Sequence, residues 1–312
     1  MQLSLKPYVA GPDTGVLSGN IDDYPDGIVI PVDKPLKWTS ADVIRKLKYA
    51  AFRHFGKKNL KVGHAGTLDP LATGVLIVCI GNATKMAETF QAHDKEYVAG
   101  ITFGATTPSY DLESEIDRFF PYGHITEDAI AEALASFTGV QKQVAPLFSA
   151  KYVDGVRAYD LARKMYAKNP GSLDEAAASL LRVSEITVSE TELLSFTPGS
   201  PECLSGASAP APGVPAESEL CSQSYDHAER ESGPSGRIHV ADIAEYGLPH
   251  ASIRIACSKG TYIRAFARDL GEALGSGAFL HSLCRSRSGD FRLSEALSLP
   301  AALSLLQAGM TK

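Results

Sequence analysis

The chain has 312 residues and 44% hydrophobic content, enough to bury a substantial core in one large domain or two smaller ones. No window approaches the ~20 consecutive apolar residues of a membrane span, and the N-terminus lacks the apolar segment of a secretory signal. The five cysteines are odd in number and scattered, without a C-x-x-C pair. This pattern argues against a disulfide framework or a zinc site, so we expect a cytoplasmic protein without a bound metal.

The formal net charge of −6 is concentrated in one segment. Residues 202–248 carry eight acids against two arginines, which accounts for the whole excess and leaves the rest of the chain neutral. Within that remainder, residues 45–61 carry seven basic residues and no acid: Arg45, Lys46, Lys48, Arg53, Lys57, Lys58 and Lys61. A charge run alone is typical of a solvated helix face followed by a loop. It nevertheless provides a local basic surface in an acidic protein.

In the first quarter of the chain, residues 27–32 predict a short strand and residues 33–35 a turn. Residues 39–42 resemble a capping box that starts a helix. Helical spacing places the apolar side chains of that helix on one face: Val43, Ile44, Leu47 and Ala51. Residues 75–80 form a continuous apolar run, typical of a strand buried on both sides.

Strand and helix signals alternate irregularly further along. We expect helices at 83–91, 127–137, 158–166, 262–274 and 300–307, and strands at 97–103, 181–194 and 253–256. A hairpin turn is predicted at 153–155. Residues 196–236 mix proline, serine and acids and bury too little apolar surface to offset the cost of ordering, so we expect an exposed, mobile insertion. This order favours an α+β fold with a mixed sheet over a doubly wound fold.

The loop before the apolar run is the strongest candidate for chemistry. Residues 63–76 (GHAGTLDPLATGVL) place Asp69 among turn residues next to a predicted rigid strand. Loops held by strands often carry function, and the proline after Asp69 restricts the backbone of the aspartate to extended conformations. An ordinary turn aspartate has the same features. The loop alone therefore leaves both interpretations open.

Four blocks, in order, resemble the motifs of the TruB family, the bacterial tRNA pseudouridine-55 synthases. Residues 63–76 resemble its catalytic G-H-x-G-x-L-D-P-x-A-x-G, and residues 32–40 (VDKPLKWTS) resemble its D-K-P-x-G-x-[ST]-S. Residues 95–97 (KEY) resemble its K-x-Y, and residues 257–264 (CSKGTYIR) its C-S-K-G-T-Y-I-R. The resemblance covers roughly 27–195 and 248–300, and four ordered blocks are far more specific than one.

The resemblance implies the pseudouridine synthase fold, with a long, mixed, mostly antiparallel sheet flanked by helices and a central catalytic cleft. We expect an N-terminal extension at 1–26, a catalytic domain at 27–300 interrupted by the insertion, and a C-terminal helix end at 301–312. TruB proteins usually end in a small RNA-binding PUA domain. The residues after Pro300 are too few for a domain, so we expect no PUA domain here, and either a weaker affinity for tRNA or compensation by the basic run.

The resemblance also implies the reaction, the isomerisation of uridine to pseudouridine at position 55 in the T-loop of tRNA, without metal or cofactor. Asp69 would be the nucleophile, which must stay ionised in a pocket, and Arg264 would pair with it and lower its pKa. Tyr97 would stack on the uracil and assist proton removal at C5. Without the resemblance, these residues fit a turn aspartate, a solvent-facing helix arginine and an alternating strand tyrosine. Attack at C1′, attack at C6 and a glycal route all remain open.

Five other residues are implied at the substrate. His64 would fill the space that the flipped base leaves, because a base must be extruded before an enzyme reaches it. Tyr262 would wall the pocket, although core packing explains it nearly as well. Leu283 and Arg285 match a leucine and an arginine beside the base. Lys34 would buttress the loop or meet backbone phosphate, and the seven basic residues of 45–61 would contact the RNA backbone.

Three functions remain in view. The first is a tRNA pseudouridine-55 synthase that acts on the T-arm stem-loop without an obligate protein partner. The second is a guide-RNA-dependent synthase of the dyskerin type, which relies on a PUA domain. The third, from another class, is a tRNA-folding chaperone without essential catalysis. The joint presence of Asp69, Tyr97 and Arg264 favours catalysis, because a pure binder needs no buried ionised carboxylate.

Overall fold

The structure is a computed structural model that describes residues 5–149, 152–153, 155–158, 161–162, 164–165, 180, 183–200 and 238–307. These fall into two compact units. Unit 1 comprises residues 5–96, 238 and 284–307, and unit 2 comprises the described residues of 97–200 and 239–283. Strands β5 (Lys95–Phe103) and β13 (Ala278–Ser288) each contribute residues to both units. The helices and the mixed sheet confirm the α+β class, whereas the predicted boundaries at 26 and 300 stay predictions.

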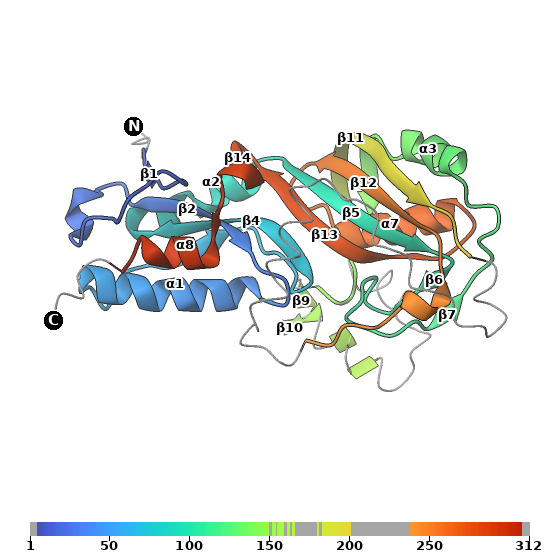
Figure 1. The fold of residues 1–312 in the computed structure, drawn as a ribbon, viewed down its shortest axis with the longest axis horizontal. Helices are drawn as coiled ribbons and strands as arrows, with labels where there is room; N and C mark the ends of the chain where they lie inside the picture. Colours follow the sequence, from blue (N-terminus) through green and yellow to red (C-terminus); the bar gives the residue numbers. More distant parts are fainter. Residues whose placement is uncertain are drawn as a thin grey trace. The chain divides into compact units, whose positions relative to one another are not determined.

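The sheet of unit 1 is built around β4 (Ala72–Ile80) (Figure 1). β4 pairs antiparallel with β2 (Ile28–Lys34) and with β3 (Val62–Ala65), and β13 is its next neighbour in strand order. Short strands extend the sheet: β1 (Tyr8–Val9) and β15 (Leu297–Ser298) lie parallel to β2, and β14 (Phe291–Arg292) pairs with β13. All nine residues of β4 are buried, which confirms the predicted doubly covered strand.

Helix α1 (Ser40–Phe55) begins where the sequence predicted. Its capping box is complete, because the Thr39 hydroxyl accepts from the amide of Asp42 while the Asp42 carboxylate accepts from the amide of Thr39. Of the predicted inward residues, Val43, Leu47 and Ala51 are buried, whereas Ile44 is only half-buried. Three further elements complete the unit: η2 (Gly81–Met86), α2 (Ala87–Ala92) and α8 (Leu299–Ser304). α8 packs on both α1 and β2 (Figure 1).

Unit 2 continues the strand order as β13-β5-β12-β11-β8. β11 (Ser184–Thr197) pairs antiparallel with β12 (His250–Cys257) and β8 (Gly139–Gln143). Helices α3 (Glu127–Ser136) and α7 (Ile263–Ala273) pack together. The rings of Phe137 and Phe266 meet edge to face, with their centroids 5.1 Å apart. Two small hairpins join β6 (Ala105–Thr106) to β7 (Arg118–Phe119) and β9 (Tyr152–Val153) to β10 (Val156–Arg157). The second confirms the hairpin predicted at 153–155.

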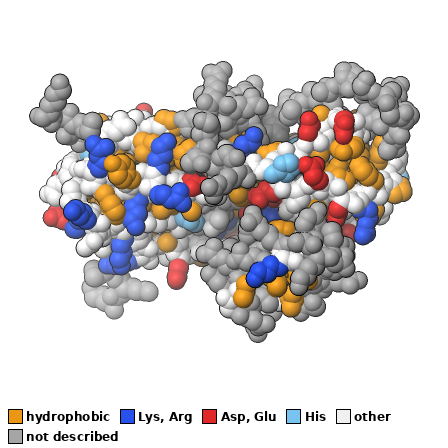
Figure 2. Space-filling view, turned by 90° about the horizontal axis from the view of Figure 1, so that it is seen from below, with side chains coloured by type: hydrophobic (Ala, Val, Ile, Leu, Met, Phe, Trp, Pro, Cys, Tyr) orange, Lys and Arg blue, Asp and Glu red, His pale blue; other side chains and the backbone are white. Residues whose placement is uncertain are grey.

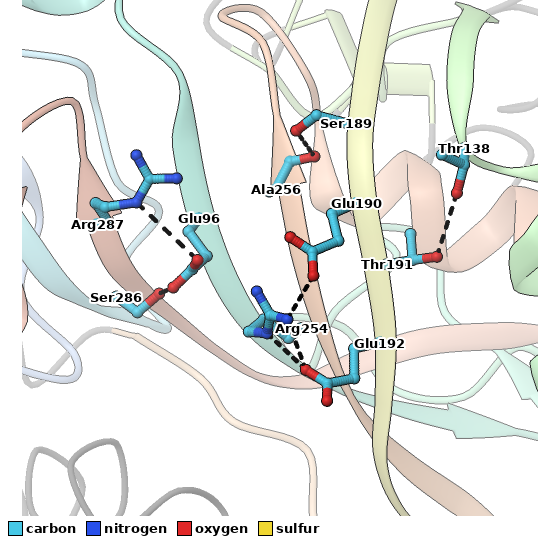
Figure 3. A network of polar contacts seen from close by, with 10 residues as sticks. All are labelled: Glu96, Thr138, Ser189, Glu190, Thr191, Glu192, Arg254, Ala256, Ser286 and Arg287. Atoms are coloured by element: carbon cyan, nitrogen blue, oxygen red, sulfur yellow. Dashed lines mark hydrogen bonds and ion pairs between the residues drawn. The ribbon is translucent and has the colours of Figure 1, made fainter.

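Side chains fix the register of β11 on β12 (Figure 3). Arg254 donates at 2.7 Å to both Glu192 and Glu190. The register shifts between Val188 and Glu190, and there the Ser189 hydroxyl donates to the carbonyl of Ala256 at 3.1 Å. An exposed ion pair stabilises little by itself, but one guanidinium holding two carboxylates on the same strand opposes slippage.

Some predicted elements were wrong or missing. Strands β3, β8 and β13 were not predicted, and neither were the two-residue strands β1, β6, β7, β14 and β15. β13 has no apolar pattern because it buries Ser282, Arg285 and Ser288. The turn at 33–35 was misplaced, since β2 continues through Lys34. The predicted helix 158–166 is described in part, and residues 158, 161–162 and 164–165 are helical. Most of the insertion 196–236 lies outside the described residues, although β11 runs into it as far as Thr197. Among the helices that the structure describes, none has the length and apolarity needed to cross a membrane.

Candidate active site

Asp69 lies in the connection between β3 and β4, half-buried, in a tight turn. The carbonyl of Asp69 accepts from the amide of Ala72 at 3.1 Å and closes the turn. The next carbonyl, of Pro70, accepts from the amide of Lys37 at 2.9 Å and from the Lys34 ammonium at 3.2 Å. The first two motif blocks therefore meet in unit 1, and the segment 34–37 holds the backbone beside the aspartate.

Two more residues of block 32–40 hold the same loop. The hydroxyl of Ser40 donates to the carbonyl of Leu68 at 3.1 Å and accepts from its amide at 2.9 Å. On the far side of the turn, the amide of Gly74 donates to the Asp33 carboxylate at 3.0 Å. Because these bonds go to main-chain groups on both sides of Asp69, they restrict the position of the loop rather than the aspartate side chain.

Lys34 has no exposed surface. Its ammonium donates to three carbonyls, of Pro35 at 2.8 Å, Trp38 at 2.6 Å and Pro70 at 3.2 Å. Burial lowers the pKa of Lys34 to about 7, against the opposing attraction of the Asp69 and Asp33 carboxylates. This geometry supports the predicted buttressing role. Contact with an RNA phosphate is not open to a side chain buried in this way.

Lys37 occupies the position that is glycine in the family motif D-K-P-x-G-x-[ST]-S. Its φ is 62°, in the left-handed region that glycine enters without steric cost. The departure from the motif was visible in the sequence, but its meaning required the backbone conformation.

His64 lies in strand β3, paired with Val78, rather than in the loop where the sequence placed it. It is half-buried. Burial, and then the nearby positive charge of Arg285, lower the pKa of the imidazole below its usual value. The ring is therefore neutral at neutral pH. Its role in filling the space of a flipped base stays a prediction.

Arg285 and Leu283, both from β13, are buried. The Arg285 guanidinium is directed to the Asp69 loop: Nε donates to the carbonyl of Val75 at 2.7 Å and Nη2 to that of Gly66 at 3.1 Å. With 1% exposure, this side chain contacts protein backbone where the sequence suggested a contact to the base. Leu283 is assigned to unit 2, and its place beside a base stays a prediction.

In unit 2, Arg264 lies in the first turn of α7 and is 7% exposed, so the interpretation as a solvent-facing arginine is wrong. Its guanidinium donates to the carbonyls of Ser109 at 3.1 Å and Phe148 at 2.9 Å. Nε lies 3.6 Å from the carboxylate of Asp111. Asp111 is buried and also accepts from the Ser109 hydroxyl at 2.6 Å.

Sequence reasoning missed Asp111, because residues 109–113 show no helical or strand period. The backbone carries a signal that the sequence does not: Tyr110 has φ 59°, in the left-handed region that a bulky residue rarely adopts. Such conformations persist only where surrounding contacts impose them, and they cluster at functional sites. Here the conformation accompanies a carboxylate turned toward a buried arginine.

The two predicted tyrosines are held firmly. Tyr97 is buried in β5. Tyr262 is half-buried, and its ring packs on the apolar cluster around Ala145 and Leu147. Its backbone exchanges two hydrogen bonds with the side-chain amide of Gln143, at 2.8 and 3.1 Å. For Tyr262, the packing role is thus visible, whereas the pocket-wall role stays a prediction.

The structure brings together Asp69, Lys34 and Arg285 in unit 1, and places Tyr97, Arg264, Tyr262 and Leu283 in unit 2. The predicted pairing of Asp69 with Arg264 stays a prediction. Within the described ranges, no group of three or more His, Cys, Asp or Glu side chains is arranged to hold a metal ion.

Comparison with known proteins decides the family. The profile described as TruB family pseudouridylate synthase (N terminal domain) matches residues 53–198. The tRNA pseudouridine synthase B of Phocaeicola vulgatus is 44% identical over 277 residues, which are 89% of this chain and 92% of that protein. This chain belongs to the TruB family of pseudouridylate synthases.

Other relatives extend the TruB family match across species. The proteins of the same name from Bacteroides thetaiotaomicron and Deinococcus radiodurans are 44% and 36% identical, over 88% and 87% of this chain and 91% and 77% of their own lengths. A chain in the crystal structure of a Cbf5-Nop10-Gar1 complex superposes with a TM-score of 0.50 at 23% identity. The match covers 92% of this chain but only 56% of that one, and at this identity it concerns the fold alone.

Proposed function

We propose that this TruB family protein isomerises uridine to pseudouridine at position 55, in the T-loop of tRNA, with Asp69 as the nucleophile. The observation that carries the proposal is the Asp69 loop, because Lys34, Ser40 and Arg285 all bond to its backbone. Relatives named tRNA pseudouridine synthase B, similar along most of the chain, support tRNA as the substrate. A preorganised loop is what a reacting group needs to attack at low entropic cost.

The proposed reaction can proceed without a cofactor. The C1′–N1 bond of the uridine breaks, the uracil rotates, a C1′–C5 bond forms, and the proton lost from C5 is balanced by one gained at N1. A carboxylate can hold a fragment covalently while the base turns, so Asp69 is sufficient as nucleophile. In the proposal, Tyr97 stacks on the uracil and assists removal of the C5 proton, and Arg264 takes the role of the arginine in the family motif.

The proposal assigns the RNA backbone to a basic surface on α1 and the loop after it, formed by Arg45, Lys46, Lys48, Arg53, Lys57, Lys58 and Lys61. All seven side chains are exposed, and those on the helix project away from its buried face. Figure 2 shows Lys and Arg side chains gathered where α1 lies, on the left of that view. The single acid of α1, Asp42 in its first turn, pairs with Arg45 at 2.6 Å. Exposed cations of this kind can displace counterions from phosphates.

The test of catalysis compares wild-type protein with Asp69→Asn on unmodified tRNA, mapping pseudouridine at single-nucleotide resolution. Loss of the nucleophile is expected to reduce the rate by at least ~10⁴-fold, as for other covalent catalysts, while tRNA binding is retained. A wild-type protein inactive on every tRNA, or a fully active Asp69→Asn variant, contradicts the proposal.

The same assay separates the alternatives. A folding chaperone without essential catalysis would restore misfolded tRNA equally well as wild type and as Asp69→Asn, and would leave no pseudouridine. A guide-RNA-dependent synthase would be inactive as purified protein and active after addition of a guide. Position-specific modification by the purified protein alone supports the first function and also the absence of an obligate protein partner.

The basic surface has its own test. Reversal of Lys57, Lys58 and Lys61 to Glu is expected to weaken tRNA binding and to reduce the slope of log Kd against log salt by ~0.9 for each lost phosphate contact. A matched control reverses three exposed cations elsewhere, Arg118, Lys142 and Arg292. An unchanged slope in the first variant, or an equal change in both, rejects a specific phosphate-binding role.

A further inference from the structure

Arg285 has a buried charge that the proposed chemistry does not use. Among the described residues it is the bulkiest of the fully buried side chains. It lies on β13, a strand whose neighbour in the sheet is β4. Burial of a guanidinium is costly unless its donors are satisfied, so the positions of its hydrogen bonds indicate its role.

Those bonds bracket the Asp69 loop. Nη2 bonds to the carbonyl of Gly66, directly after β3, and Nε bonds to that of Val75, within β4. One rigid, planar group therefore joins the chain just before and just after the turn that carries the aspartate. An ammonium, which is a compact point charge, cannot reproduce two donors held in a fixed fork.

The loop is shaped to receive the arginine. Gly74 has φ +96°, and a Cβ there would stand 2.3 Å from the Arg285 carbonyl oxygen and 2.7 Å from its amide nitrogen. Gly66 has φ +84°, and its position faces Nη1 of Arg285 at ordinary contact distance. Both ends of the loop therefore adopt conformations that favour glycine, and both lie against Arg285.

The electrostatic surroundings make burial of the charged Arg285 side chain unfavourable for stability. Its charge lowers the pKa of Lys34, a second buried cation that bonds the same loop. In the part of the chain that the structure describes, no carboxylate forms an ion pair with Arg285. An apolar side chain of similar volume would fill the space without the cost of burying a charge. The contribution of the guanidinium thus lies in fixing the two carbonyls.

We propose that Arg285 is a positioning residue, which ties together the two ends of the loop and thereby sets the place of the Asp69 carboxylate. It acts through the backbone and touches neither base nor phosphate. The identity of the reaction rests on the proposed function, whereas the ordering of the loop does not.

The kinetic test compares Arg285→Met and Arg285→Lys with wild type on unmodified tRNA. A displacement of about 1 Å in a reacting group costs on the order of 100-fold in rate, so Arg285→Met is expected to lower kcat about 100-fold with KM changed less than about threefold. Arg285→Lys keeps the charge but not the fork and is expected to lose at least about tenfold. Arg287→Met, two residues along β13 at a half-buried position, is the matched control and is expected to keep wild-type kcat.

Hydrogen exchange of the amides of residues 66–71, between β3 and β4, gives a readout that needs no activity. Both Arg285 variants are expected to lose protection in this loop while the β2–β4 ladder stays protected; if Arg285→Met does not fold, Arg285→Lys alone decides. Wild-type kcat in Arg285→Lys, or a loss of kcat with loop protection unchanged, overturns the positioning role. A rise in KM alone overturns it too, because it indicates contact with substrate. An inactive wild-type protein contradicts the proposed function and leaves the exchange experiment valid.

Discussion

The Asp69 loop of unit 1 and the Arg264 site of unit 2 bury their cations in different ways. In both, a regular element supplies the cation and less regular backbone supplies the carbonyls. β2 and β13 carry Lys34 and Arg285, which bond to the carbonyls of the Asp69 loop. α7 carries Arg264, which bonds to the carbonyls of Ser109 and Phe148.

The difference lies in the carboxylate. Arg264 has Asp111 within 3.6 Å, a partner as deeply buried as itself. Lys34 and Arg285 donate to neutral carbonyls, and the Asp69 and Asp33 carboxylates attract Lys34 without outweighing the cost of its burial. A carboxylate can neutralise and orient a buried arginine, whereas carbonyls only solvate it. We infer that an ion pair stabilises the buried arginine of unit 2. In unit 1, the buried cations hold a loop in place and lower the free energy of unfolding.

Removal of the unit 2 carboxylate is expected to have the largest effect on stability. Asp111→Ala leaves a buried guanidinium without its nearby anion and should lower the free energy of unfolding by about 4 kcal/mol. Urea denaturation measures it. Asp117→Ala, at an exposed aspartate bonded to Thr106, is the control and should change stability by less than about 0.5 kcal/mol. If the two variants are equally stable, the carboxylate does not distinguish the two units.

Crowding of the Asp69 loop in unit 1 is expected to have the second largest effect on stability. Gly74→Ala places a Cβ against the backbone of Arg285 at a positive φ, and should cost about 3 kcal/mol from overpacking and strain together. Gly123→Ala, where the added Cβ has no atom within 4 Å and no positive φ is required, is the control. Thermal unfolding of both variants measures the contrast. Equal melting temperatures would show that the loop can move away from β13.

The pH dependence of the free energy of unfolding tests whether burial of the Lys34 ammonium destabilises unit 1. Burial lowers the pKa of Lys34 from 10.5 to about 7. Between these values the unfolded chain keeps the proton and the folded chain does not, so unfolding takes up a proton and stability rises with pH. The contribution of Lys34 is at most about 1.4 kcal/mol per pH unit in this window. Lys34→Met should remove that slope in urea titrations from pH 7 to 10, and identical slopes would contradict the burial cost.

The smallest effect is expected at the motif position that departs from glycine. Lys37 has φ 62° in the segment that cradles the Asp69 loop. Lys37→Gly should relieve the left-handed strain and raise the free energy of unfolding by about 1 kcal/mol. Lys57→Gly is the control, because Lys57 is an exposed loop lysine whose φ is not positive. This substitution should not raise the free energy of unfolding. A destabilised Lys37→Gly would mean that the lysine side chain contributes more than its backbone costs.

Several features of the fold were predictable from local sequence. The capping box at Thr39 placed the start of α1, and the apolar run placed β4 as a buried strand. The turn around Asp69 followed from its proline and glycines. These predictions succeed because caps, periodicity and turns depend on residues a few positions apart. The four ordered motif blocks marked the candidate site within the sequence itself.

Other features came only from the tertiary structure. β13 was missed because its arginine and serines break the apolar pattern, and their burial is possible only where distant carbonyls accept their protons. The bonds of Arg285 reach Val75 and Gly66, 210 and 219 residues away in sequence. Asp111 was missed for the same reason, since its partner Arg264 lies far along the chain. By itself the sequence determined which residues are chemically able to act. Only the tertiary structure decided which of the buried cations would hold a loop and which would be paired with a carboxylate, because hydrogen bonds between distant segments exist only after folding.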